Sequence, residues 1–290
     1  SLPLAINVTH NLSLCLTFCL KTLRQQYTTP LTSPSLMTNY SLNGILLRSH
    51  WQYQVRKNGD RRSCNCCDGS KRAAPLLHAI AKTYSSCVKQ PVQRMFIALS
   101  ALLGHGLFGG DAKDAFAHSP PPERPTFVQI DDAYADWYKH KFGKKVDRTL
   151  VLPVQHALQG HPESGRLWEE HINKILCDEH LNFRSTTHDK CIYYAMYKGH
   201  TVLMLCQVDD FLISCKLKSV AKQIYNYIGN KLQLHKELVA PFKYLGPATD
   251  YNGVDINQTK HYIKISCPGY INCVNCAHGW EHPGPDDITS

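Results

Sequence analysis

Two adjacent carboxylates interrupt an apolar part of this chain. Asp209 and Asp210 lie between residues 201–206 and 211–215, two runs whose composition is typical of buried strands. A turn between such strands would present both carboxylates at one tip. Because adjacent like charges repel, a cation that neutralises them stabilises the arrangement, and Mg²⁺ prefers oxygen ligands of this kind. An ordinary solvated turn is the alternative interpretation of this segment taken alone.

A third carboxylate favours the metal-binding interpretation. Asp111 follows residues 107–110 (LFGG), which resemble a short buried strand and contain two glycines that allow other groups to approach closely. A carboxylate at one strand end and a pair on a later hairpin together predict a metal site of three Asp. Phosphoryl transfer with two metal ions uses such a site, because one ion activates the attacking oxygen and the other stabilises the leaving oxygen. We assign Lys113 and Asp114, which follow, to a surface pair.

The elements that must position these carboxylates are short strands and amphipathic helices. Strands are predicted at residues 51–55, 107–111, 126–130, 191–197, 201–206 and 211–215, with two more near Asn252 and Gly253 and at 261–265. Helices are predicted at residues 90–105, 165–180 and 218–235 from the spacing of their apolar residues. Asn58 and Gly59 predict a hairpin turn after the first strand. These elements show no regular βαβ repeat, so the sequence favours an α+β fold over a doubly wound α/β fold.

The composition excludes several classes of protein. Of the 290 residues, 43% are hydrophobic and 19% are charged, and the formal net charge is +9. This balance excludes a disordered chain, and the modest Gly and Pro content excludes collagen. The length allows a sizeable core in one domain or two. The surplus of positive charge fits an anionic partner such as nucleic acid.

Thirteen cysteines and sixteen histidines raise zinc binding as a rival hypothesis. Two clusters hold candidate ligands: Cys64, Cys66 and Cys67 with His78, and Cys273 and Cys276 with His278. Neither cluster has the two closely spaced ligand pairs of a structural zinc site. We therefore expect free thiols in a reducing, intracellular setting.

Around the carboxylates the sequence resembles a known family. Residues 110–116 (GDAKDAF) resemble the first catalytic motif of reverse transcriptases, and residues 207–210 (QVDD) resemble their Tyr-Val-Asp-Asp box. Further family blocks follow in the same order as residues 51–59, 158–168 (LQGHPESGRLW), 183–193 (FRSTTHDKCIY), 244–246 (YLG), 257–265 and 278–280. Together they are similar to the reverse transcriptases of copia-type LTR retrotransposons. The resemblance covers residues 50–285, leaving 1–49 as a leader or linker and 286–290 as a truncated tail.

The resemblance implies an RNA-directed DNA polymerase whose antiparallel palm sheet is packed on helices and joined to fingers. Asp111, Asp209 and Asp210 match the family's catalytic carboxylates, which would hold two Mg²⁺ or Mn²⁺ ions. The implied nucleotide-binding residues are Phe116, Gln159, Gly160, Arg62, Lys71 and Arg72. The implied template–primer residues are Gln207, Val208, Tyr244, Leu245 and Gly246. Arg166 and Trp168, which lie in an amphipathic helix, are assigned structural roles.

The resemblance also implies partners and a location. A reverse transcriptase of this type acts on an RNA or DNA template with a primer and on dNTPs, and its polyprotein includes integrase and RNase H. It works in the cytoplasm, in a virus-like particle, or in the nucleus. No membrane partner is expected, because the apolar stretch 12–20 is shorter than the ~18 residues that a membrane span needs.

Two departures from the family pattern leave an alternative open. Gln207 stands where the family box begins with Tyr, and Cys64 stands where the family has an Arg expected to contact triphosphate. Arg61, Arg62, Lys71 or Arg72 could compensate for the second change. The alternative function is a catalytically decayed remnant that still binds nucleic acid.

Overall fold

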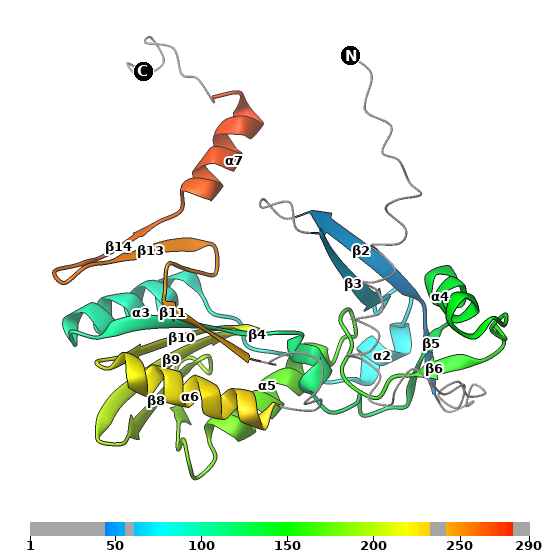
Figure 1. Ribbon diagram of the computed structural model, residues 1–290, viewed down its shortest axis with the longest axis horizontal. Coiled ribbons are helices and arrows are strands. Elements are labelled where there is room, and N and C mark those ends of the chain that lie inside the picture. Colours follow the sequence, from blue (N-terminus) through cyan, green and yellow to red (C-terminus); the bar gives the residue numbers. More distant parts are fainter. Residues whose placement is uncertain (1–43, 56–60, 233–241, 281–290) are drawn as a thin grey trace. The chain divides into compact units, whose positions relative to one another are not determined.

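The computed structural model describes residues 44–55, 61–232 and 242–280 (Figure 1). These residues belong to two compact units. The first unit contains the described residues up to 85 and residues 114–173, and the second contains 86–113, 174–232 and the described residues from 242 onward. The three predicted carboxylates all fall in the second unit.

A six-stranded antiparallel sheet forms the centre of the second unit (Figure 1). Its strand order is β11-β4-β10-β9-β8-β7. The strands are β4 (Gly106–Ala112), β7 (Arg184–Ser185), β8 (Ile192–Tyr197), β9 (His200–Gln207), β10 (Asp210–Cys215) and β11 (Phe242–Pro247). Strands β8, β9 and β10 follow one another through tight turns, whereas β4 lies between β10 and β11 and comes from far earlier in the chain. This placement makes β4 and β10 neighbours.

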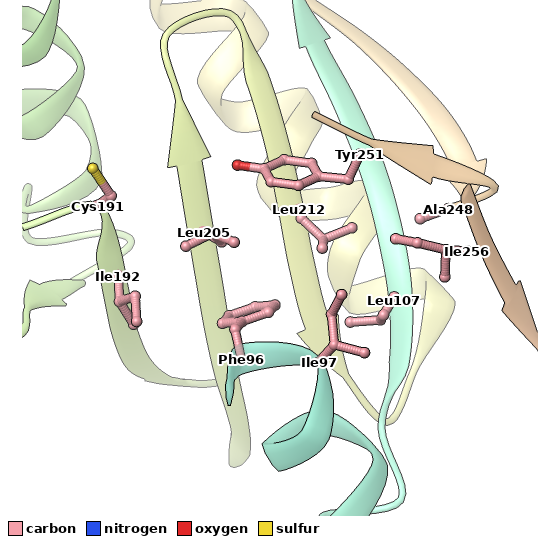
Figure 2. Close-up of a cluster of buried hydrophobic side chains, with 10 residues drawn as sticks. All are labelled: Phe96, Ile97, Leu107, Cys191, Ile192, Leu205, Leu212, Ala248, Tyr251 and Ile256. Carbon is pink, nitrogen blue, oxygen red and sulfur yellow. The ribbon is translucent and has the colours of Figure 1, made fainter. Parts of the chain in front are cut away.

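Two helices cover opposite faces of this sheet. Figure 2 shows Phe96 and Ile97 of α3 (Gln90–Leu102) beside Leu107, Leu205 and Leu212 of the sheet. On β10 the preceding residue, Phe211, instead contacts Phe242, which stacks on Tyr225 of α6 (Lys218–Lys231). Because successive side chains of a strand point to opposite faces, α3 and α6 lie on opposite sides of the sheet.

The helix α3 buries a different stripe from the one that its apolar residues suggest. Spacing alone selects Val92, Phe96, Leu99 and Leu103, but the buried residues are Gln93, Phe96, Ile97 and Ser100. Two polar residues are accommodated because Gln93 donates a hydrogen bond to the Tyr251 carbonyl and the Ser100 hydroxyl bonds to the Phe96 carbonyl. Satisfied polar groups can be buried at little cost, so apolar spacing misjudged the buried face by about one position.

The second unit ends in a smaller sheet and a helix. Strands β12 (Asp250–Tyr251), β13 (Val254–Gln258) and β14 (Ile263–Ser266) form an antiparallel sheet that is followed by α7 (Pro268–His278). Asn252 and Gly253 have φ values of 48° and 76°, which is the geometry that an Asn-Gly hairpin turn requires. This confirms the strands predicted around that dipeptide.

The first unit is built from short strands and helices around two small cores. Its three-stranded sheet has the order β1-β5-β6, and β2 pairs with β3 in a separate hairpin. The elements are β1 (Ile45–Leu47), β2 (Ser49–Val55), β3 (Arg61–Cys67), α2 (Pro75–Ile80), η2 (Ala115–His118), β5 (Thr126–Gln129), α4 (Asp132–Phe142), β6 (Val151–Pro153) and α5 (Ser164–Leu176), which runs on into the second unit. Tyr134, Trp137 and Tyr138 form an aromatic core on one side of α4.

Most of the predicted elements are confirmed, with shifted ends. The predicted helix 90–105 ends at Leu102, and 165–180 corresponds to Ser164–Leu176. The predicted helix 218–235 is described to Lys231, and the predicted turn at Asn58 and Gly59 lies outside the described residues, although the strands that flank it pair as a hairpin. Strands β1, β6, β7 and β11 and helices α2, α4 and α7 were not predicted, because they are short or weakly amphipathic. Within the described residues no helix is long and apolar enough to cross a membrane.

Candidate active site

A row of four polar side chains crosses the central sheet of the second unit. Asp111 of β4 is the register partner of Asp210 of β10. On the outer sides of this pair, Asp210 faces Gln207 of β9, and Asp111 faces Lys243 of β11. Directly opposed residues in antiparallel strands point to the same face and lie about 5 Å apart at Cα. The prediction that Asp111 and the Asp pair lie on neighbouring strands is therefore confirmed.

The turn that carries Asp209 is strained. Val208 and Asp209 connect β9 to β10, and Val208 has a φ of 52°. A hairpin turn with positive φ at its first central residue is of the type that usually has Gly there, and a β-branched residue in this region is strained. The Ala112 amide of β4 donates a hydrogen bond of 2.8 Å to the Asp209 carbonyl. The neighbouring strand thus holds the turn in place, and strain of this kind clusters at functional sites.

The carboxylates act on one another electrostatically. Burial, followed by the charges of Asp209, Asp111 and Asp250, raises the pKa of Asp210 to about 6. A carboxyl whose pKa is raised by neighbouring carboxylates is stabilised by a cation. Asp250, at the start of β12, was not among the predicted site residues. No sequence motif marks it, because only the packing of β12 near β10 brings its charge close to Asp210.

The donor chemistry of this cluster fits Mg²⁺ or Mn²⁺, because carboxylate oxygens are the ligands that these ions prefer. Among the described residues, however, no three His, Cys, Asp or Glu side chains converge closely enough to form a complete metal site. The predicted three-Asp site is therefore not a closed cage among the described residues. Asp111 and Asp210 lie in register, and Asp209 lies on the adjoining turn.

The glycine before Asp111 is required by its surroundings. A Cβ on Gly110 would lie 2.5 Å from Cε1 of Tyr225 and 2.7 Å from Cε1 of Phe242. At Gly109 the nearest atom would be Cβ of Leu245 at 3.5 Å, an ordinary contact. The prediction of close approach at these glycines is confirmed for Gly110, and the approaching groups are the protein's own aromatic rings.

The Gln207 amide is engaged at both ends by the segment before α3. Its Oε1 accepts a hydrogen bond of 2.7 Å from the Val88 amide, and its Nε2 donates to Sγ of Cys87 at 3.4 Å. The template–primer role of Gln207 stays a prediction. These two bonds join the end of β9, directly before the Val208–Asp209 turn, to residues far earlier in the chain.

A comparison with protein families decides which class of protein carries these carboxylates. The model of the family described as reverse transcriptase (RNA-dependent DNA polymerase) matches residues 49–278, which is most of the chain. The chain belongs to this reverse transcriptase family. No curated protein matches the chain. Among solved structures, the apo telomerase of Candida tropicalis, truncated from its C-terminal domain, is similar at 12% identity and a TM-score of 0.40, over 89% of this chain and 60% of that one.

In this reverse transcriptase domain, the predicted nucleotide-binding residues lie in the first unit. Gln159 and Gly160 are exposed, and the Gln159 carbonyl accepts a hydrogen bond of 2.8 Å from the Cys67 amide. Gly160 has a φ of 89°, and a Cβ there would lie 2.1 Å from the Cys67 carbonyl oxygen, so the backbone contact requires glycine. This contact brings Gln159 and Gly160 to the end of β3, shortly before the exposed Lys71 and Arg72.

Other predicted nucleotide-binding residues are less defined. Phe116 is half-buried in the 3-10 helix η2, and its role at the nucleotide stays a prediction. The backbone of Arg62 and Cys64 belongs to β3, but the positions of these two side chains lie outside the described structure. The triphosphate contact of Arg62 stays a prediction.

The predicted primer-end residues lie on the edge strand β11. Tyr244 points toward α6, where its ring lies 5.8 Å from that of Tyr225, whereas Leu245 is exposed. The ladder with β4 shifts register between Tyr244 and Gly246, and Gly246 has a φ of 91°. This bulge leaves Leu245 exposed and Gly246 half-buried, beside the strand that carries Asp111.

Arg166 has the structural role assigned to it. Its guanidinium pairs with Glu123 at 2.7 Å, Glu170 at 2.9 Å and Glu163 at 3.0 Å, and its Nε donates to the Lys82 carbonyl. Trp168 on the same helix is buried.

The zinc hypothesis finds no ligand group among the described residues, where no three His, Cys, Asp or Glu side chains lie close enough to share a metal ion. Cys67 is buried, and burial raises the pKa of its thiol to about 12, which disfavours the thiolate that zinc binds. The ten cysteines whose side chains are described lie in no disulfide.

Proposed function

We propose that this chain is the RNA-directed DNA polymerase domain of a copia-type retrotransposon and adds deoxynucleotides to a primer 3′-hydroxyl. The observation that carries the proposal is the register of Asp111 opposite Asp210, beside the strained turn that holds Asp209. In this proposal the second unit is the palm and the first unit is the fingers.

The three carboxylates would hold two Mg²⁺ ions. Ions bound there would neutralise charge on the triphosphate and would lower the pKa of the primer 3′-hydroxyl. Asp111 and Asp210 orient their oxygens from adjacent strands, and the Ala112 bond to the Asp209 carbonyl restrains the third carboxylate. Most of the catalysis would come from this positioning and from charge stabilisation.

The first unit would bind the incoming nucleotide. Lys71, Arg72 and Arg62 supply positive charge for the triphosphate, Gln159 and Gly160 contact the nascent pair, and Phe116 selects against a ribose 2′-hydroxyl. A template–primer duplex is the expected partner of a chain with a net charge of +9, and its binding should weaken steeply with salt. Integrase and RNase H of the same polyprotein, and a location in the cytoplasm, a virus-like particle or the nucleus, complete the proposal.

A decayed nucleic-acid-binding remnant is the second candidate. It is favoured by Gln207, whose amide is occupied by Cys87 and Val88 where the family has a tyrosine. Cys64 in β3 is the other departure.

Primer extension by the purified chain on a poly(rA)–oligo(dT) substrate, with Mg²⁺ or Mn²⁺, tests the proposal. Duplex binding is measured on the same samples by fluorescence anisotropy. Extension that is abolished by Asp209→Asn and retained by Asp147→Asn, the same change at an exposed loop residue, supports the polymerase. Binding without extension, with extension restored by Cys64→Arg plus Gln207→Tyr, supports the remnant. Extension that survives Asp209→Asn contradicts the carboxylate mechanism.

A further inference from the structure

A buried tyrosine hydroxyl lies between the two strands that carry Asp111 and Asp210. Tyr225 of α6 is 1% exposed. Its hydroxyl accepts a hydrogen bond of 3.1 Å from the Ile213 amide of β10. The hydroxyl proton lies between two carbonyl oxygens, that of Phe108 on β4 at 2.8 Å and that of Phe211 on β10 at 3.1 Å. Because Phe108 and Ile213 are register partners, one side chain joins both strands at the same level of the ladder.

The phenol ring lies against β4 next to Asp111. A Cβ on Gly110 would lie only 2.5 Å from Cε1 and 2.7 Å from Cζ of the Tyr225 ring. Gly110 directly precedes Asp111, and Phe211, whose carbonyl receives the hydroxyl, directly follows Asp210. Tyr225 therefore contacts the backbone neighbour of each carboxylate, from the face opposite to the one to which the carboxylates point.

We propose that Tyr225 is a positioning residue that holds β4 and β10 at the spacing which Asp111 and Asp210 need to share metal ions. The inference rests on the proposed function, because the carboxylates need this spacing only if they bind cations together. Functional groups must be held to within about 0.5 Å of their working geometry, which requires support behind them.

The hydroxyl, and not only the ring, carries this role. A phenylalanine would fill the same space beside Gly110, but it could neither accept from the Ile213 amide nor donate to the two carbonyls. Burial raises the pKa of Tyr225 well above its ordinary value, so the hydroxyl keeps its proton around neutral pH. Hydrogen bonding at this point therefore persists under the conditions in which the carboxylates are ionised.

The test compares two tyrosines of the same helix in the full chain. Tyr225→Phe removes the hydroxyl between the strands, and Tyr227→Phe removes a hydroxyl that donates to the Asp178 carboxylate instead. Mn²⁺ binding is measured by EPR of the free ion, and primer extension is measured as kcat and KM for dTTP. For Tyr225→Phe we expect the half-saturating Mn²⁺ concentration to rise and kcat to fall about tenfold each, with KM changed less than about twofold. Tyr227→Phe should leave all three values unchanged.

A second pair of variants keeps the hydroxyl and disturbs its place. Gly110→Ala brings a Cβ against the Tyr225 ring, whereas Gly109→Ala meets only an ordinary contact with Leu245. Gly110→Ala should weaken Mn²⁺ binding as Tyr225→Phe does, and Gly109→Ala should not. This pair decides the question if Tyr225→Phe does not fold, as judged by circular dichroism.

The outcomes separate this inference from the proposed function. Mn²⁺ binding and kcat within about twofold of wild type in a folded Tyr225→Phe chain would overturn the positioning role. Equal effects of Tyr225→Phe and Tyr227→Phe would also overturn it, since they would indicate general destabilisation. A wild-type chain that binds Mn²⁺ through Asp209 but extends no primer would contradict the polymerase proposal alone.

Discussion

The two units of this molecule surround their carboxylates in opposite ways. In the first unit, Glu163 is 1% exposed and pairs with Arg166, which also binds Glu123 and Glu170. In the second unit, Asp210 is half-buried, and burial together with the charges of Asp209, Asp111 and Asp250 raises its pKa. In the first arrangement a cation of the protein pairs with the buried carboxylate, which serves the fold. An added cation would stabilise the second arrangement further, which is the property expected of a site that works on bound metal ions.

The largest expected effect comes from removing a carboxylate of the second unit. Asp209→Asn should reduce primer extension by about a thousandfold, or about 4 kcal/mol of activation free energy. The melting temperature should stay the same or rise, because the change relieves repulsion. Steady-state extension and thermal denaturation in EDTA check both parts. A variant that loses stability as well as activity would show that the cluster serves the fold.

Removing the Arg166 guanidinium from the first unit should instead lower the stability of the fold. Arg166→Met leaves Glu163 as an uncompensated buried charge, so the free energy of unfolding should fall by about 3–5 kcal/mol. The control is Arg148→Met, because Arg148 pairs with Asp132 at 2.6 Å on the surface and should cost less than about 1 kcal/mol. Urea denaturation measures both. Equal costs for the two variants would contradict the contrast between the units.

Acid should destabilise the first unit through a buried histidine. Burial, and then the charge of His78, lowers the pKa of His161 to about 4. Nδ1 of His161 accepts a hydrogen bond from the Glu163 amide, so protonation there would break that bond. Because the unfolded chain binds the proton more readily, stability is complete above pH 6.5 and falls as the pH drops to about 4. The loss should be on the order of 3 kcal/mol.

Unfolding free energies of the wild type and of His161→Gln across this pH range isolate that contribution. The variant should be less stable at pH 7 but should lose less stability on acidification. If the unfolding free energy of the variant fell with pH in parallel with that of the wild type, His161 would not be the cause of the acid sensitivity.

The smallest expected effect concerns Asp250. Its charge acts on Asp210 from β12, so Asp250→Asn should weaken Mn²⁺ binding about twofold at low salt, and the difference should disappear at high salt. Asp255→Asn is the control, because Asp255 pairs with Asp250 across the β12–β13 ladder and is not among the charges that raise the Asp210 pKa. An effect of Asp250→Asn that persists in 1 M salt would indicate direct metal contact.

The sequence alone determined the family, the α+β class and the strands on either side of Asp111 and of the Asp209–Asp210 pair. These features depend on local composition and on motif order, which are properties of the linear chain. It also determined that close approach occurs beside Asp111, since two glycines at the end of an apolar strand leave space that a neighbouring group can fill.

Only the tertiary structure decided which groups meet across long distances in the chain. The register of Asp111 with Asp210, the Gln207 bonds to Cys87 and Val88, and the charge of Asp250 join residues that no motif links. The Tyr225 hydroxyl is the clearest case, because in the sequence it is one apolar position of an amphipathic helix. A hydrogen bond depends on positions to within a few tenths of an ångström, and such positions are set by the packing of the whole unit rather than by local sequence.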